Sequence, residues 1–352
     1  MTEPDPAPAP HKRRVRYSGK NPRRFEDKYK EHNSAAHPET VAKVLASGKT
    51  PAGQHIPILL PEIMKVLAPQ SGERALDCTL GHGGHSLALL QAIQPDGTLL
   101  ALDQDPIEIV RAESRLRATG CPEDSLVVRR MNFAGLRRAL DEVGWVDGAD
   151  VLLADLGLSS MQIDNPTRGF TFKQDGPLDM RMNPQRGASA RDLLKRINVE
   201  KLAGLLSENA DEPRAALLAE ALAGKDYSGT KAFAVAIREA LPVRVPDEER
   251  ELTVRRVFQA VRIEVNEEFT ALDTLLRQLP SCIRAGGRVA ILTFHSGEDR
   301  RVKHFFRDGL RNGVFGATNN EVIRASPEEQ RANPRSAPAK LRWAVRSAER
   351  TG

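Results

Sequence analysis

The sequence predicts an α/β fold, in which a doubly wound, Rossmann-like parallel sheet is interrupted by a helical insert. Two observations predict it. Short apolar segments alternate with amphipathic ones between residues 74 and 155, and the alternation returns between residues 269 and 345. Almost no strand pattern lies between residues 162 and 250. Strands separated by helices form βαβ units and a parallel sheet, so the stretch without strands reads as an insert.

The elements follow in chain order. Apolar runs predict the strands, Pro106 suits a helix start, and Ser228 or Thr230 is a suitable cap for a helix in the insert. In the second half, the turn Gly286-Gly287 is expected to lead into a strand. The predicted strands are 74–79, 99–103, 126–130, 151–155, 288–294 and 341–345. The predicted helices are 86–93, 107–118, 133–143, 213–223, 231–241, 247–264, 269–283 and 299–310.

Length and composition exclude several classes of protein. The 352 residues suffice for one large core or two domains. No apolar run approaches the roughly 20 residues of a membrane span, and no apolar stretch follows a basic start as in a signal peptide. Cys78, Cys121 and Cys282 form no CxxC pair. We therefore expect no disulfide framework and no metal site, in a protein of the reducing cytoplasm.

Positive charge is concentrated at the start of the chain. Residues 1–50 hold 11 Lys and Arg against 6 Asp and Glu, which equals the whole net charge of +5. This Pro-rich segment is expected to be disordered, and it either contacts nucleic acid or only aids solubility. Later basic clusters suit a polyanion such as RNA or are ordinary solvated faces. They are Arg300, Arg301, Lys303, Arg307 and Arg311, and then Arg335, Lys340, Arg342 and Arg346.

A glycine-rich turn after the first strand predicts a nucleotide-type site. The turn Gly81–His85 lets a ligand approach the backbone at the start of a helix. Asp103 ends the second strand, where a carboxylate accepts ribose hydroxyls, and Phe133 follows the third strand, where a ring stacks on a purine. The alternative readings are a tight turn for the glycines, a helix cap for Asp103 and a core residue for Phe133. The dinucleotide motif GxGxxG would need Gly or Ala at Ser86, and spacing alone does not choose the cofactor.

Longer motifs carry a family resemblance from about residue 53 to residue 350. They are DCTLGHGGHS, LLALDQDP, DVLLADLGLSSMQIDNPTRGFTF, DGPLDMRMNP, FQAVRIEVNEE, GGRVAILTFHSGEDRRVKHFF and NPRSAPAKLRWAVRSAER. This sequence resembles the bacterial 16S rRNA cytosine-N4-methyltransferase family, RsmH (also called MraW). The resemblance implies a class I methyltransferase sheet at 53–161 and 265–352, a substrate-recognition insert at 162–264, and a basic extension at 1–50.

The resemblance also implies a function and its residues. The family is cytoplasmic and uses S-adenosylmethionine to methylate N4 of a cytidine in the decoding centre of 16S rRNA of the small ribosomal subunit. By motif, the donor-binding positions are Gly83, Gly84, His85, Asp103, Phe133, Asp155 and Gln162. Oligomeric state is left open.

Three features depart from the family pattern. Residues 1–50 precede the usual start. The family's HPATRTFQA reads LTVRRVFQA at 252–260, and its FHSLEDR reads FHSGEDR, with Gly297 in place of leucine. The last two changes affect expected substrate-side contacts and leave the donor motif intact.

Asp155 is the candidate catalytic residue, because a carboxylate at the end of the fourth strand is placed to accept an N–H of the target amine or to contact the donor. The alternative is that the Asp155 carboxylate only caps the turn that follows the strand. Loops after the donor motif are predicted to form the substrate wall, and His295 is expected to be structural. The wall residues are Arg168, Gly169, Phe170, Asp179, Met180 and Arg181, of which Phe170 and Met180 suit the insert core equally well.

Three other functions compete. An amino-methyltransferase acting on DNA or another RNA often has a DPPY-like motif, where this chain has Asp155-Leu156-Gly157-Leu158. A non-catalytic RNA-binding assembly factor would not need the intact donor motif. A nicotinamide-dependent oxidoreductase is disfavoured by Ser86.

Overall fold

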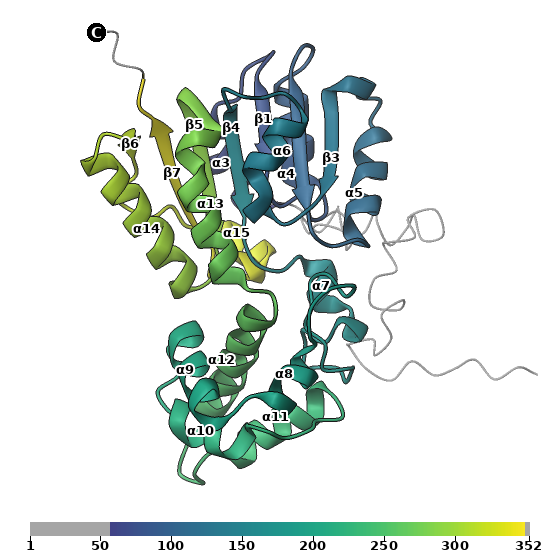
Figure 1. Ribbon diagram of the computed structural model, residues 1–352, viewed down its shortest axis with the longest axis vertical. Helices are drawn as coiled ribbons and strands as arrows, with labels where there is room; N and C mark the ends of the chain where they lie inside the picture. Colours follow the sequence, from purple (N-terminus) through teal and green to yellow (C-terminus); the bar gives the residue numbers. More distant parts are fainter. Residues whose placement is uncertain (1–56, 349–352) are drawn as a thin grey trace, which may run out of the picture. The chain divides into compact units, whose positions relative to one another are not determined.

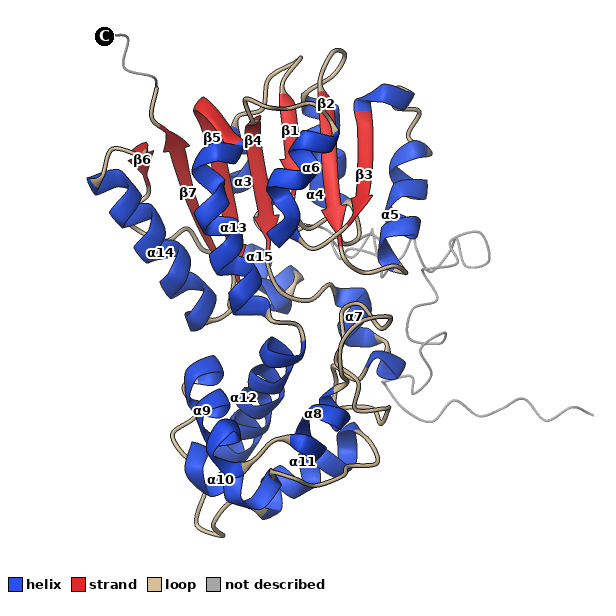
Figure 2. Ribbon diagram, in the orientation of Figure 1, coloured by secondary structure: helices blue, strands red, loops and turns tan. Residues whose placement is uncertain are grey.

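The computed structural model describes residues 57–348, and their centre is a seven-stranded sheet (Figure 1, Figure 2). The strands are β1 (Arg74–Asp77), β2 (Thr98–Asp103), β3 (Leu126–Arg130), β4 (Ala149–Asp155), β5 (Ile283–Thr293), β6 (Phe315–Thr318) and β7 (Lys340–Arg346). Their order is β3-β2-β1-β4-β5-β7-β6. The first five are parallel, β7 is antiparallel to β5, and β6 is antiparallel to β7. The order changes direction between β1 and β4, where open parallel sheets bind ligands.

Helices cover both faces of the sheet (Figure 2). The helices on one face are α6 (Leu136–Glu142), α13 (Glu268–Cys282) and α14 (Ser296–Arg311). The helices on the other face are α3 (Leu60–Leu67), α4 (Gly84–Ala92) and α5 (Glu108–Arg117). Successive strand residues point to opposite faces, so Leu76 packs in the first core and Ala75 in the second. Burial on both sides explains the continuous apolar strands, and the predicted Rossmann-like fold is confirmed.

The chain between β4 and α13 is a helical insert with a separate apolar core. Its helices are α7 (Ser160–Asp164), α8 (Ala190–Arg196), α9 (Val199–Ala210), α10 (Ala215–Leu222), α11 (Thr230–Glu239) and α12 (Asp247–Val265). The rings of Phe233 and Phe258 lie 5.3 Å apart in this core. No described residue from 156 to 282 belongs to a strand. We keep the division at 162–264 as a proposed domain boundary.

Local predictions failed at two turns. α11 begins after Gly229, and neither Ser228 nor Thr230 caps it; the Thr230 hydroxyl donates to the Gln174 carbonyl at 3.3 Å instead. The glycine pair at 286–287 lies inside β5 rather than before it. The pairing with β4 shifts register between Ala149 and Val151, so the glycines form a bulge, with Gly286 at φ +76°.

The remaining expectations concern the number of elements, the N-terminal extension, the cysteines and membrane-spanning helices. The sequence prediction omitted α3, α7, α8, α9, β6 and α15 (Pro327–Ala332). The extension predicted at 1–50 lies outside the described residues. The three cysteines are free thiols. Within residues 57–348, no helix has the length and apolar character needed to cross a bilayer.

Candidate active site

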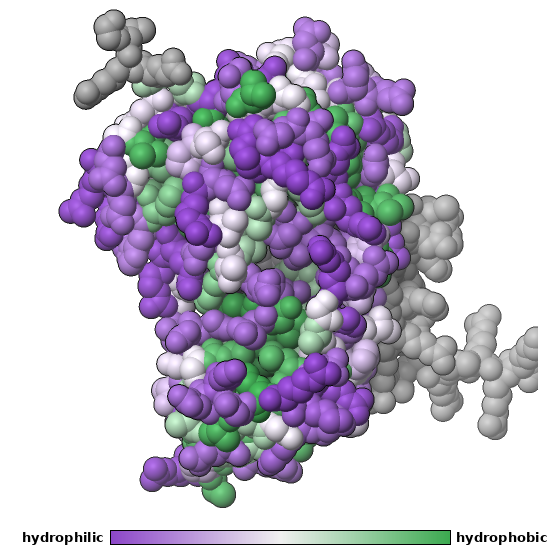
Figure 3. All heavy atoms as spheres, in the orientation of Figure 1, coloured by the Kyte–Doolittle hydropathy of each residue, from purple (hydrophilic) through white to green (hydrophobic). Residues whose placement is uncertain are grey.

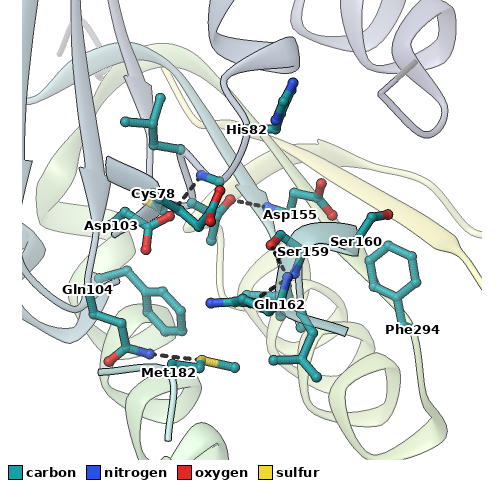
Figure 4. A pocket seen from close by; sticks show the side chains of 18 of the residues that line it. Cys78, His82, Asp103, Gln104, Asp155, Ser159, Ser160, Gln162, Met182 and Phe294 are labelled. Carbon is teal, nitrogen blue, oxygen red and sulfur yellow. Dashed lines mark hydrogen bonds between the residues drawn. The ribbon is translucent and has the colours of Figure 1, made fainter. Parts of the chain in front are cut away.

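A cavity of about 400 Å³ opens at the carboxyl ends of β1, β2 and β4. Figure 4 shows Asp103, Asp155 and Gln162 around it. All predicted donor-site residues line this cavity, and they come from separate stretches of the chain. They are Gly83, Gly84, His85, Asp103, Phe133, Asp155 and Gln162.

The glycine turn joins β1 to α4 through two residues in the left-handed region. Gly81 has φ +48° and Gly83 has φ +86°, and side chains rarely adopt such values. Gly83 is also the residue before α4, so no side chain caps this helix. Among the described residues, no cap therefore accepts the first N–H groups of α4, at a helix end that lines the cavity. Such an end favours a negatively charged group.

Asp103 fixes the turn as well as facing the cavity. Its carboxylate accepts the N–H of Gly81 and the N–H of Asp105, each at 2.8 Å. Burial raises the pKa of Asp103 to about 6, although these two hydrogen bonds lower it. Each carboxylate oxygen keeps a lone pair beyond the backbone contact. The group therefore holds the turn in place and can still accept two hydroxyls.

Asp155 lies beside His85, whose Nδ1 is 3.4 Å from the Asp155 Oδ2, and the two form an ion pair when the ring is protonated. The buried His85 ring has its Nε2 3.0 Å from the Ile58 carbonyl oxygen. A carbonyl only accepts, so Nε2 carries a proton and Nδ1 carries one only in the cationic ring. Burial lowers the pKa of His85, but the hydrogen bond and charge of Asp155 outweigh it and raise that pKa. The pair can therefore take up one proton at Nδ1, beside the carboxylate.

Phe133 lies in the cavity wall next to a polar chain of contacts. It packs partly against the core below α6. The preceding Asn132 donates from Nδ2 to the Gln104 Oε1 at 2.9 Å. Gln104 in turn donates to the Met182 sulfur at 3.0 Å, as Figure 4 shows. A residue of the insert thereby closes the cavity beside the predicted purine position.

The polar atoms of the Gln162 side chain are already engaged by protein groups. Its Oε1 accepts the N–H of Ser159 at 3.0 Å, within a capping box that starts α7. Its Nε2 donates to the Asp105 Oδ2 at 2.8 Å. A ligand can use only the remaining N–H and lone pair. Gln162 therefore shapes the cavity at least as much as it offers hydrogen bonds.

The structure contradicts the predicted substrate wall at Arg168 and Met180. Arg168 is buried, and its Nη1 lies 2.8 Å from Oδ2 of the fully buried Asp105, while Nη2 donates to the Met182 carbonyl at 2.8 Å. Met180 is buried in the insert core, and Phe170 packs partly against that core. Arg181 pairs with Asp179 at 2.7 Å. None of these residues lines the cavity, because packing and ion pairs use their side chains.

Sequence reasoning missed a charged group on the same cavity, at the junction of α12 and α13. The Arg262 guanidinium donates twice to Glu268, both at 2.8 Å. Burial lowers the pKa of Arg262, but Glu268 and Glu298 outweigh it and raise that pKa. Asn266 holds the insert loop by accepting the N–H of Met182 at 2.7 Å. The family motif FQAVRIEVNEE covers this segment, but the sequence analysis gave none of its residues a role.

His295 has a structural position, as predicted. Its Nδ1 accepts the N–H of Glu298 at the start of α14, and its ring packs against Phe269. His295, Glu298 and Glu268 offer ligand atoms within 4.8 Å of one another. However, Arg262 already neutralises Glu268. We therefore assign no metal to this group, and the expected absence of a metal stays a prediction.

The departures from the family motif fit their surroundings. A Cβ at Gly297 would meet the Phe269 ring at 2.5 Å, so this ring occupies the space that a larger residue would need. The segment 252–260 lies in α12, where Val254, Val257 and Phe258 are part of the insert core. Neither change alters the residues predicted to bind the donor.

Comparison with known proteins gives the family. The MraW methylase family matches residues 52–347. The chain is 44% identical to "Ribosomal RNA small subunit methyltransferase H 1" of Lachnoclostridium phytofermentans, over 96% of this chain and 93% of that protein. It is 45% identical to "Ribosomal RNA small subunit methyltransferase H 2" of Alkaliphilus metalliredigens, over 95% of this chain and 97% of that protein.

Matches of this length reach into residues 1–50, so these relatives share part of the segment that the sequence analysis treats as an extension. A solved S-adenosylmethionine-dependent O-methyltransferase of Thermotoga maritima is only 11% identical, with a TM-score of 0.38 over 83% of this chain and 66% of that one. A likeness at that level supports no conclusion. The family match does, and the chain belongs to the MraW methylase family as a methyltransferase with a class I, Rossmann-like sheet.

Proposed function

We propose that this enzyme transfers a methyl group from S-adenosylmethionine to the exocyclic N4 of a cytidine in the decoding centre of 16S rRNA, in the cytoplasm. The observation that carries the proposal is the meeting of the donor motif, Asp103 and Asp155 in one cavity at the switch point of the sheet. The names of the relatives, which are small-subunit rRNA methyltransferases, support the choice of RNA.

The cavity residues fit the donor in charge and hydrogen-bonding type. Asp103 would accept the ribose hydroxyls, the uncapped start of α4 would receive the carboxylate of the methionine part, and Phe133 would stack on the adenine. The volume of about 400 Å³ falls in the range of small-molecule sites. When bound, the donor supplies a methyl group on a positively charged sulfur.

The contacts that His85 and Gln162 make within the protein limit how each can bind the donor. The ring nitrogens of His85 face Ile58 and Asp155, so His85 would contact the donor through its backbone at the start of α4. Gln162 would reach it only through the N–H that Asp105 leaves free or the lone pair that Ser159 leaves free. Both side chains therefore serve to orient carboxylates near the donor.

Asp155 is assigned to the target amine. The nitrogen lone pair of N4 is delocalised into the ring, and an acceptor for an N–H of N4 localises it. The Asp155 carboxylate is 26% exposed and so accessible from the cavity. As the N–C bond forms and the methyl–sulfur bond of the donor breaks, Asp155 would accept the proton that N4 loses, and the Nδ1 of a neutral His85 ring would then take it up. Correct positioning of amine and donor supplies roughly 7–11 kcal/mol of the barrier lowering.

The target base must leave its stack to reach this position. In the view of Figure 4, Asp155 lies between Asp103 and Phe294. The Phe294 side of the cavity also includes Arg262 and Glu298. An unstacked cytosine would find an aromatic surface and charged hydrogen-bonding partners there, which is how single RNA bases are bound.

The test uses the full-length enzyme, S-adenosylmethionine with an isotope-labelled methyl group, and unmethylated small ribosomal subunits, with naked 16S rRNA and duplex DNA in parallel. The products are digested to nucleosides and analysed by mass spectrometry. We expect label in N4-methylcytidine from the subunit or its RNA. Label only in DNA, in another nucleoside, or nowhere would contradict the proposal.

A further inference from the structure

One exposed face of α14 carries a stripe of basic side chains. Its members, here called the α14 stripe, are Arg300, Lys303, His304, Arg307 and Arg311, all exposed. Their spacing of three or four residues puts them on one side of the helix. The other side, with Val302 and Phe306, is buried against the sheet. Successive turns therefore present a basic group about every 5.4 Å.

The two acidic residues in the first turn of α14 are engaged by groups outside the α14 stripe. Glu298 is buried and accepts the N–H of Phe294 at 2.8 Å. Asp299 accepts from Arg342 at 2.6 Å and from Lys340 at 3.3 Å, both on β7. These two residues belong to the second basic cluster of the sequence analysis, and they are thus used inside the protein.

Part of the α14 stripe forms no ion pair with the residues that the structure describes. Arg300 pairs with Asp211 at 3.0 Å and Arg307 with Asp308 at 2.9 Å, both at the surface. Within the described part of the chain, Lys303 and Arg311 form no ion pair. Exposed charges of one sign, spaced along a helix, attract a polyanion.

The α14 stripe starts beside the active site. Phe294, just before α14, and Glu298, in its first turn, line the cavity, and the 16-residue helix runs away from it. A hollow of about 180 Å³ flanks the stripe, with Lys303, Arg307, Thr318 and Asn319 in its wall. Figure 3 shows hydrophilic residues over this helix. The α14 stripe and the hollow together therefore form a charged, partly concave surface that extends from the cavity.

From this geometry we infer that the α14 stripe binds the phosphate backbone of the substrate RNA next to the target nucleotide, with a sugar or phosphate in the flanking hollow. The inference rests on the proposed function, because an RNA strand whose base enters the cavity must continue along a neighbouring surface. The contact is electrostatic and independent of sequence. It strengthens RNA binding and leaves the donor site unchanged.

The test compares two full-length double variants, each lacking two exposed positive charges. One is Lys303→Gln with Arg311→Gln. The control is Lys65→Gln with Arg284→Gln, near the amino ends of the strands and away from the cavity. Because Arg284 pairs with Asp150 at 3.0 Å, thermal unfolding checks that the control stays folded. Binding to unmethylated small subunits is measured without donor at several salt concentrations. Methyl transfer and S-adenosylmethionine affinity are measured separately.

The stripe variant should bind the subunit roughly tenfold more weakly. Its slope of log affinity against log salt should be smaller by about 1.5. KM for the subunit should rise, while kcat and donor affinity stay at wild-type values. Lys303→Glu with Arg311→Glu should weaken binding further, and the control should match the wild type.

Equal affinity and equal slope for the stripe and control variants would overturn the inference. Wild-type enzyme that binds subunits but forms no N4-methylcytidine would instead refute the proposed function. The binding comparison still decides the role of the α14 stripe in that case.

Discussion

Two aspartates at the ends of parallel strands have different environments and so suit different roles. Asp103 is largely enclosed and bonded to two backbone N–H groups, which favours fixed hydrogen bonding to a ligand. Asp155 is part-exposed and paired with His85, which can receive a proton. At this scale the motif resemblance named residues that line one cavity, and their role in binding the donor stays a prediction. Arg262 and Glu268 could not be predicted, because the return of α12 to the cavity is a tertiary contact.

Replacing Asp155 tests its catalytic role. Asp155→Asn keeps the size and one acceptor oxygen but removes the base. We expect kcat to fall at least about 100-fold, with S-adenosylmethionine affinity unchanged. Single-turnover transfer and calorimetric donor binding measure the two quantities. Asp147→Asn, an exposed position, serves as control. A loss below about tenfold would restrict Asp155 to a structural role.

The pKa of Asp103 predicts a pH dependence of donor binding. Burial raises this pKa to about 6, so the carboxylate is ionised above that pH and protonated below it. Only the ionised form accepts both ribose hydroxyls. Donor affinity should therefore be highest above pH 6 and fall as the pH drops through about 6. Titrations of donor binding between pH 5 and pH 8 check this with wild type, Asp103→Asn and the exposed control Asp124→Asn. The same pH dependence in Asp103→Asn would assign it to another group.

At the scale of elements, the buried pair between Arg168 and Asp105 joins the insert to the loop after β2. Arg168 is only 8% exposed and Asp105 is 0% exposed. Asp105 also accepts from Gln162, so the pair connects the insert loop with a predicted donor-site residue. Breaking it from one side leaves a buried charge without its partner.

Arg168→Met should therefore lower the free energy of unfolding by about 3 kcal/mol. Urea denaturation measures the change, and donor affinity should fall with it because Gln162 loses its fixed neighbour. The control is Arg331→Met, whose exposed pair with Glu328 lies at the surface and should leave stability unchanged. A loss no larger than that of the control would show that the pair does not hold the two elements together.

The elements that the sequence predicted are those with a strong local pattern. β3 was predicted with its observed bounds, because apolar residues and turns delimit it. α8 and α9 were omitted although Ser189 and Asn198 cap them, since no clear break separates these short helices. β6 has four residues including Gly316, and among the described strands it pairs with β7 alone. The bulge in β5 likewise depends on the pairing with β4, which no local pattern contains.

At the scale of the described molecule, the layered sheet and the helical insert follow from the alternation of patterns along the chain. The composition of the cavity does not, because it draws residues from the sheet, the insert and the segment at 334–338. Motif resemblance marked these segments as belonging together, and tertiary structure shows which side chains they contribute. The central claim is that this combined cavity methylates N4 of a cytidine in 16S rRNA.

The most direct measurement is N4-methylcytidine in 16S rRNA from cells that lack the gene. Small-subunit RNA is digested to nucleosides and quantified by mass spectrometry, with the gene for wild type or Asp155→Asn restored at equal protein levels. The account predicts that deletion removes N4-methylcytidine, that the wild type restores it and that Asp155→Asn does not. An unchanged level of N4-methylcytidine after deletion would contradict it.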